Sequence, residues 1–274
     1  MALFLVGTPI GNLEDITLRA LRVLKEVRLI AAEDTRTTRK LLNHFGIRTP
    51  LVSYFEHSNI ARLEQVLKAA MESDVALVSE AGMPGLSDPG FEMVRSALDR
   101  GIRVIPIPGA NAPVAALVAS GHQSDRFLFL GFLPRRASER RKLLAAVSGE
   151  PYTLVLFEAP HRILDSLADM VRLLGNRRLA VARELTKVYE EIFRGTIEEA
   201  IQHFAEPRGE FTIVVEGNLE ATALPSEKDI ERALQRAILE GLSRRDAVAR
   251  VTKETGWTKR NVYRAYLSST STST

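Results

Sequence analysis

The sequence contains no cysteine, and this absence excludes several kinds of site at once. Without a thiol the chain has no disulfide framework, no thiolate nucleophile and no zinc-thiolate centre. Aromatic residues make up only 6% of the 274 residues. No apolar run approaches the roughly 20 residues of a membrane span, and the start lacks the pattern of a signal peptide. The sequence therefore predicts a soluble, cytoplasmic protein with no membrane contact, and the lack of a metal-ligand cluster predicts no obligatory metal.

One long loop dominates the first half of the chain. We call residues 79–90 the central loop; they follow an apolar run, Val75–Val78, that predicts a buried strand. Three Gly and two Pro between Gly82 and Gly90 prevent any regular element there. The loop is longer than a turn requires, which favours ligand binding over an ordinary surface loop. Ligands gather at the carboxyl ends of strands in open α/β sheets, and glycines let the backbone approach them.

Two more Gly/Pro loops, Gly7–Asn12 and Pro108–Pro113, also follow predicted strands. Their spacing matches neither the dinucleotide fingerprint nor a P-loop. Alternation of strands and helices predicts a mostly parallel sheet that collects the three loops at one edge. Pro106 lies inside one of the strands, which places that strand at an edge of the sheet or at its own end.

A polar break at Gly121–Asp125 separates a second α/β pattern that begins at Phe127. Extended segments close together near its end predict antiparallel strands. The pattern predicts three domains: an α/β domain over residues 1–120, a second over 121–222, and a helical one over 223–274. Within the last, we expect a linker at 221–225 to precede the helices and a low-complexity tail at 268–274 to follow them.

Charged residues mark two places in the α/β pattern. Glu33, Asp34 and Arg36 directly follow a strand and form a candidate site; the alternative is a helix cap, with Asp15 expected to cap the preceding helix in the same way. A basic cluster follows the strand that begins at Phe127. Its members, which alone are a weak signal for phosphate contact, are Arg135, Arg136, Arg140, Arg141 and Lys142.

The C-terminal segment is basic although the whole chain carries only +3. Residues 226–267 hold ten Lys or Arg against six Asp or Glu. Helical patterns with caps at Ser243 and Thr258, and Gly256 between them, predict a helix-turn-helix-like unit. Such a unit binds nucleic acid or serves as a plain packing module, and its charge favours a polyanion.

Several motifs in order resemble the ribosomal RNA small subunit methyltransferase I family of the tetrapyrrole methylase superfamily. They are Leu5–Leu13, Ala31–Arg36, the central loop, Pro108-Gly109, Phe157–Arg162 and Ala182–Lys187. The resemblance implies two α/β domains with the cofactor between them, a small C-terminal helical domain, and a homodimer. It also implies S-adenosylmethionine as methyl donor and, as acceptor, the ribose 2′-hydroxyl of a cytidine in the decoding region of small-subunit (16S) rRNA, presented as naked rRNA or as the 30S subunit.

The resemblance further implies which residues hold the cofactor. They are Ala81, Gly82, Met83, Leu86, Ser87, Asn111, Ala112, Phe157, Glu158, Glu184 and Leu185. This chain has Glu80 and Met83 where the family usually has Asp and Thr. Binding through the backbone tolerates both departures, whereas a catalytic role for an Asp carboxylate at position 80 does not.

The remaining chemical task is to accept the proton of the hydroxyl. The candidates are Asp34, Glu80, Glu184 and Lys187, with Arg36 as a phosphate contact.

Two other functions remain open: a methylase of a small molecule such as a tetrapyrrole, and an RNA-binding assembly factor without activity. The basic C-terminal helices argue against the first, and the three ligand-binding loops against the second.

Overall fold

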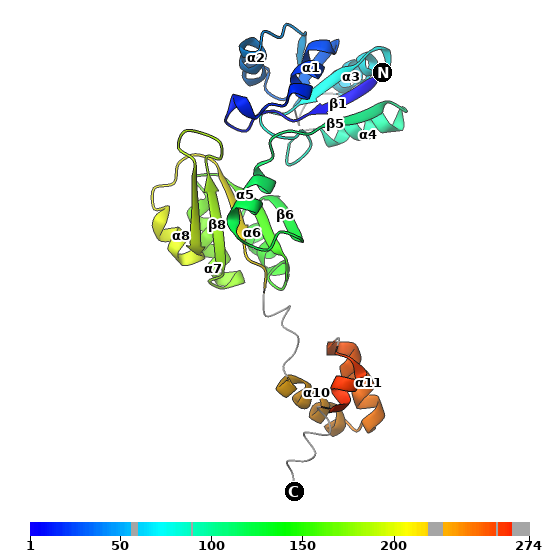
Figure 1. The fold of residues 1–274 in the computed structure, drawn as a ribbon, viewed down its shortest axis with the longest axis vertical. Helices are drawn as coiled ribbons and strands as arrows, with labels where there is room; N and C mark the ends of the chain where they lie inside the picture. Colours follow the sequence, from blue (N-terminus) through cyan, green and yellow to red (C-terminus); the bar gives the residue numbers. More distant parts are fainter. Residues whose placement is uncertain (56–59, 89, 219–226, 256, 265–274) are drawn as a thin grey trace. The chain divides into compact units, whose positions relative to one another are not determined.

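The computed structural model describes residues 1–55, 60–88, 90–218, 227–255 and 257–264 (Figure 1). The expected linker at 221–225, the turn at Gly256 and the tail at 268–274 lie outside them. Contacts divide the chain into two units. The first unit, Met1–Ser148 with Tyr152–Gly217, holds both α/β lobes, and the second holds the C-terminal helices.

The first lobe is built on a parallel sheet of five strands in the order β3-β2-β4-β1-β5. The strands are β1 (Ala2–Val6), β2 (Leu29–Ala32), β3 (Leu51–Ser53), β4 (Val75–Val78) and β5 (Arg103–Ile107). The parallel sheet is as predicted, and so is the edge position of β5. Pro106 has no N–H to donate, and an edge strand leaves one side of its backbone unpaired.

Helices cover both faces of this sheet. They are α1 (Leu18–Glu26) and α2 (Thr35–His44) on one face, and α3 (Ile60–Glu72) and α4 (Phe91–Asp99) on the other. β4 therefore leads to the opposite face from both of its neighbours, β1 and β2. Loops after such strands diverge and leave a crevice at the carboxyl edge. The predicted cap Asp15 is wrong: it lies in a short 3₁₀ helix, η1 (Leu13–Asp15), and Thr17 caps α1 instead.

The second lobe has a mixed sheet in the order β6-β7-β10-β8-β9. The strands are β6 (Phe127–Phe132), β7 (Thr153–Glu158), β8 (Arg178–Arg183), β9 (Glu191–Thr196) and β10 (Phe211–Val215). β10 is antiparallel to β7 and β8, and β9 is antiparallel to β8, which confirms the antiparallel prediction. β6, β7 and β8 point the same way, so the loops after them share one edge.

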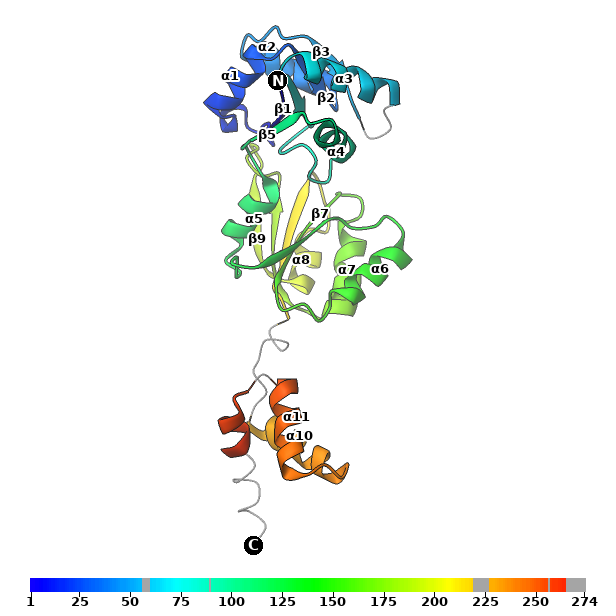
Figure 2. The same cartoon turned by 90° about the vertical axis from the view of Figure 1, so that its right-hand side faces the viewer.

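Figure 2 shows α5 on one side of this second sheet and α6 with α7 on the other. The helices are α5 (Ala112–Ser120), α6 (Ala137–Ala146), α7 (Ile163–Leu174) and α8 (Ile197–His203). Ala116 and Leu117 of α5 are buried against Val155, Ala180 and Val214. A helix that follows a strand of the first sheet thus completes the core of the second lobe.

The C-terminal unit has its own small core. α10 (Glu227–Leu239), α11 (Arg244–Thr255) and a helix over residues 259–264 surround it. Its buried members include Ile230, Leu234, Val248 and Val262. The predicted caps are confirmed: Ser243 Oγ accepts from the Asp246 amide at 3.2 Å, and Thr258 Oγ1 from the Asn261 amide at 3.4 Å. Across the described part of the chain, no helix is long and apolar enough to cross a membrane.

Candidate active site

The three Gly/Pro loops of the first lobe meet at the carboxyl edge of its sheet. Thr8 and Gly82 exchange two backbone hydrogen bonds, of 2.9 and 3.0 Å, which join the loops after β1 and β4. A β-carbon placed on Gly109 would lie 2.8 Å from the carbonyl oxygen of Gly7. Only glycine permits this approach of the loops after β1 and β5. The sequence predicted this meeting, and the structure confirms it.

Loops of the second lobe reach the same place. A β-carbon on Gly131 would lie 2.9 Å from Ser87 Oγ, and one on Gly11 would lie 3.0 Å from the carbonyl oxygen of Leu185. Gly131 belongs to β6, and Leu185 follows β8. The carboxyl edges of the two sheets therefore meet, and the candidate site lies where they do.

The central loop offers backbone donors at this place. Gly82 uses its N–H and its carbonyl on Thr8. Among the described residues, the amides of its neighbours Ala81 and Met83 have no acceptor. A β-carbon on Gly85 would meet nothing within 4 Å, so the loop is open at that residue. Two amides without an acceptor in the described protein suit the carboxylate of an amino-acid moiety.

The other predicted cofactor residues from this lobe follow in the central loop and after β5, where a β-carbon on Gly82 would lie 3.6 Å from the Ala110 carbonyl oxygen. Leu86 is half-buried and its amide donates to the Met83 carbonyl at 3.3 Å. Ser87 is exposed and adopts a positive φ of 62°. Asn111 caps α5 by accepting from the Val114 amide at 3.0 Å, and Ala112 is the first residue of that helix.

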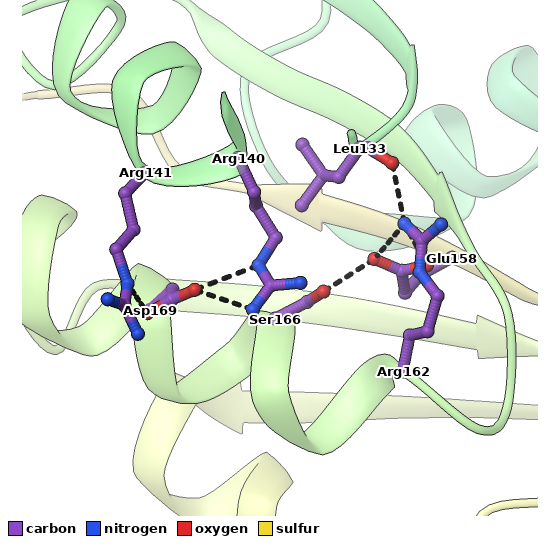
Figure 3. A network of polar contacts seen from close by, with 7 residues as sticks. All are labelled: Leu133, Arg140, Arg141, Glu158, Arg162, Ser166 and Asp169. Carbon is purple, nitrogen blue, oxygen red and sulfur yellow. Dashed lines mark hydrogen bonds and ion pairs between the residues drawn. The ribbon is translucent and has the colours of Figure 1, made fainter. Parts of the chain in front are cut away.

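Glu158 lies at the end of β7, but its side chain points into the lobe. It is fully buried, pairs with Arg162 at 2.8 Å and accepts from Ser166 Oγ at 2.5 Å. Arg162 also donates to the Leu133 carbonyl at 2.5 Å (Figure 3). The Glu158 carboxylate is therefore committed to the protein, and only the backbone there can serve a cofactor. Phe157 of β7 contacts the rings of Phe129 and Phe132 in β6 and remains half-buried.

The same figure accounts for part of the predicted basic cluster. Arg140 is buried and pairs with Asp169 at 2.7 Å, and Arg141 pairs with the second oxygen of the same carboxylate at 2.7 Å (Figure 3). Burial raises the pKa of Asp169, but the hydrogen bonds from the two guanidinium groups bring it below the ordinary value. Arg140 is thus a structural residue, whereas Arg135, Arg136 and Lys142 are exposed.

The candidates after β2 behave as the helix-cap alternative predicts. Asp34 caps α2 by accepting from the Arg36 amide at 2.7 Å, and its other oxygen pairs with the Arg36 side chain at 3.2 Å. The hydrogen bond from that side chain lowers the pKa of Asp34 and raises that of Arg36. A carboxylate with a lowered pKa is a weak proton acceptor. Arg36 remains exposed and keeps donors for a phosphate.

Glu184, Leu185 and Lys187 lie in the loop after β8. Lys187 Nζ pairs with Glu184 and with Glu210, each at 2.9 Å. Burial lowers the pKa of Lys187, but its two carboxylate partners hold it above the ordinary value. Burial raises the pKa of Glu184, but hydrogen bonds from Lys187 and the Glu210 amide bring it below the ordinary value. Neither residue is therefore a good proton acceptor at neutral pH, and Leu185 packs with the core below α5.

Sequence reasoning missed Asp88, which is the perturbed carboxyl group of the central loop. Burial, and then the negative charge of Glu33, raise the pKa of Asp88 to about 6. Glu80 is exposed nearby, and its amide donates to Glu33 Oε2 at 3.3 Å. A pKa closer to neutral makes Asp88 a stronger base than Asp34 or Glu184. The sequence shows Asp88 only as a loop residue, because its burial depends on β2 and β4 being neighbours.

No group of three or more His, Asp or Glu within the described ranges has the geometry to hold a metal ion.

Residues 2–201 match the protein family described as tetrapyrrole (corrin/porphyrin) methylases. The chain is 49% identical to the ribosomal RNA small subunit methyltransferase I of Halalkalibacterium halodurans, over 96% of this chain and 94% of that protein. It is 46% identical to the protein of that name from Synechocystis, over 97% of each.

The chain belongs to the ribosomal RNA small subunit methyltransferase I family. Solved structures of lower sequence identity share the fold. A diphthine synthase matches with a TM-score of 0.62 at 14% identity, over 79% of this chain and 90% of that one. A uroporphyrin-III C-methyl transferase from Thermus thermophilus, complexed with S-adenyl homocysteine, matches with a TM-score of 0.56 at 21% identity, over 79% and 97%. The shared fold is that of the two α/β lobes described above.

Proposed function

We propose that this protein transfers the methyl group of S-adenosylmethionine to the ribose 2′-hydroxyl of a cytidine in the decoding region of small-subunit rRNA. The observation that carries the proposal is the match of 44–49% identity over at least 96% of the chain to three relatives with the same name. That name specifies an rRNA methyltransferase of the small subunit. The cytidine and its 2′-hydroxyl come from the family resemblance stated above.

The residues at the meeting of the two sheets fit the cofactor. Its amino-acid carboxylate matches the amides of Ala81 and Met83, and its adenosine matches the half-buried side chains of Phe157 and Leu185. Neither Glu80 nor Met83, the two departures from the family loop, obstructs binding of this kind, because it uses backbone groups. When bound, S-adenosylmethionine supplies a methyl group already activated for in-line attack.

The protein's own part in the reaction is to position the acceptor and to receive its proton. Holding a hydroxyl oxygen in near-attack geometry contributes about 7–11 kcal/mol in favourable cases. A positioned carboxylate adds roughly 10²–10⁴-fold. We assign the proton to Asp88 or Glu80 of the central loop, ahead of Asp34, Glu184 and Lys187, whose partners hold them in the charged form. Arg36 is left to bind a phosphate of the target nucleotide.

The wider parts of the proposal concern partners. The basic C-terminal unit binds the rRNA or the 30S subunit, the active form is a homodimer, and the enzyme works in the cytoplasm where ribosomal subunits are made. The homodimer rests on the family resemblance, and light scattering on the purified protein measures it. A small-molecule methylase on the same fold is the second candidate, because the fold neighbours include an enzyme named for uroporphyrin.

The deciding experiment measures methyl transfer from tritiated S-adenosylmethionine to small ribosomal subunits from a strain that lacks this activity. We expect label on a cytidine 2′-oxygen of the decoding region, mapped by nuclease digestion. Intact cofactor binding without transfer to subunits or naked rRNA would favour the small-molecule substrate. RNA binding without any cofactor binding would favour an assembly factor.

A further inference from the structure

A single exposed aromatic side chain, Phe132, lies at the carboxyl end of β6. The pairing of β6 with β7 shifts register between Phe129 and Phe132, and Gly131 takes a positive φ of 62°. Such a bulge re-aims the residue that follows it. Phe132 is 55% exposed as a result, in a chain where aromatic residues are few.

The bulge places Phe132 next to the candidate active site. Gly131, its immediate neighbour, lies against Ser87 of the central loop, since a β-carbon there would be 2.9 Å from Ser87 Oγ. The ring of Phe132 also contacts that of Phe157, with centroids 5.2 Å apart. The exposed ring therefore borders the same edge that holds the predicted cofactor residues.

Buried contacts fix the backbone beneath the ring. Leu133 is 1% exposed, and its carbonyl accepts from Arg162, which the buried Glu158 carboxylate holds in turn (Figure 3). Phe157 packs edge-on against Phe129 at 5.3 Å. A ring held in this way loses little conformational entropy when a planar ligand stacks on it.

Two arginines follow Phe132 closely in the sequence. Arg135 and Arg136 are exposed, and Arg136 forms a surface pair of 3.3 Å with Glu139. Arg135 has no ion pair with any described residue. An aromatic face beside guanidinium groups is the arrangement that single-stranded nucleic acids recognise, with bases on the ring and phosphates on the cations.

We propose that Phe132 stacks on an unpaired base of the RNA substrate and that Arg135 binds a neighbouring phosphate. The inference rests on the proposed function and names the part of the RNA that this surface takes. Sequence-specific RNA recognition favours unstacked nucleotides, and a ribose hydroxyl must leave a regular helix to reach the methyl group. The adenine of the cofactor is the other planar ligand nearby, but a cofactor has no phosphate to match the adjacent arginines.

The test compares Phe132→Ala with Phe127→Ala in the full chain. Phe127 is a matched control because it is 41% exposed and lies at the other end of the same strand. We expect Phe132→Ala to lower kcat/KM for unmethylated small subunits about tenfold or more, mainly through KM. Calorimetry should give an unchanged Kd for S-adenosylmethionine. Phe127→Ala should leave both quantities unchanged.

Two further variants separate stacking from packing. Phe132→Trp should restore the subunit KM, whereas Phe132→Leu should not, because only an aromatic ring stacks. Arg135→Ala should weaken RNA binding and reduce the slope of log K against log salt by about one.

Each adverse outcome has a distinct meaning. Equal kcat/KM for Phe132→Ala and Phe127→Ala overturns the inference, as does equal rescue by Leu and Trp. A cofactor Kd that rises in step with the loss of kcat/KM assigns the ring to adenine and overturns the RNA contact. Absence of transfer by the unaltered protein overturns the proposed function itself, and this inference with it.

Discussion

At the scale of single residues, the burial of Asp88 in the central loop makes the stability of the fold depend on pH. Its pKa rises from 3.8 to about 6 in the folded protein, mainly through burial and then through Glu33. At pH values between 3.8 and about 6, Asp88 therefore keeps its proton in the folded state, whereas it has lost that proton in the unfolded chain. The contribution to the free energy of unfolding is fully present below the lower pKa and is lost as pH rises through the upper one.

Replacing the Asp88 carboxyl group with an amide should remove the loss of stability at higher pH. We expect Asp88→Asn to raise the melting temperature at about pH 7.5 and to leave it unchanged at about pH 4, because the amide resembles the protonated acid. Exposed Asp99 of α4 provides the control Asp99→Asn, which should show no such difference between the two pH values. A stabilisation by Asp88→Asn that is the same at both would show that Asp88 is not held protonated by its surroundings.

Asp169 makes a second prediction at this scale, on the energy of a buried charge. It and Arg140 each keep only 6% of their side chains exposed. Asp169→Asn should lower the free energy of unfolding by about 3–5 kcal/mol in urea titrations, because it leaves Arg140 buried without a counter-charge. Glu26→Gln breaks a pair with Arg22 in which both side chains are 60% exposed, and should cost about 0–1 kcal/mol. A similar cost for both would contradict the role given to burial.

At the scale of elements, the close approach of two loops makes a sharp prediction. Gly109→Ala would place a β-carbon 2.8 Å from the backbone of Gly7, where no flexible side chain can yield. Overpacking of this kind costs about 1–3 kcal/mol, and displacement of the loops should weaken cofactor binding measured by calorimetry. Gly149→Ala is the control, because its β-carbon would meet nothing within 4 Å. Unchanged cofactor affinity in Gly109→Ala would separate the loop contact from the binding site.

The elements also show what the sequence can and cannot predict. Apolar runs ending in Gly/Pro loops were enough to predict a parallel sheet with its loops at one edge. Pro106 predicted either a sheet edge or a strand end, and the structure places β5 at the edge. The packing of α5 on the second sheet was not predictable, because its small side chains give no periodic signal for the surface they cover. The sequence also missed the bulge at Gly131 and the inward orientation of the Glu158 side chain, because both depend on contacts between segments that lie apart in the chain.

At the scale of the whole molecule, the α/β lobes and the C-terminal helices form different contact units, and we propose that they serve catalysis and RNA affinity respectively. The C-terminal unit has its own buried core, while the three Gly/Pro loops that we propose to hold the cofactor lie in the first unit. The exposed cations of the C-terminal unit include Arg236, Arg245, Lys253, Lys259 and Arg260. Such residues add affinity for phosphates without touching the reacting atoms.

Removing residues 226–274 should therefore weaken RNA binding and leave cofactor binding intact. We expect the shortened protein to bind S-adenosylmethionine with unchanged Kd by calorimetry, and to bind rRNA more weakly with a shallower salt dependence. The double variant Lys259→Glu with Arg260→Glu provides a control in the full-length chain, because it reverses two exposed charges on a helix whose core residue, Val262, stays in place. It should reproduce the loss of RNA affinity in part. If truncation leaves RNA affinity and its salt slope intact, the rRNA is bound by the α/β lobes alone, and the C-terminal helices are a packing module.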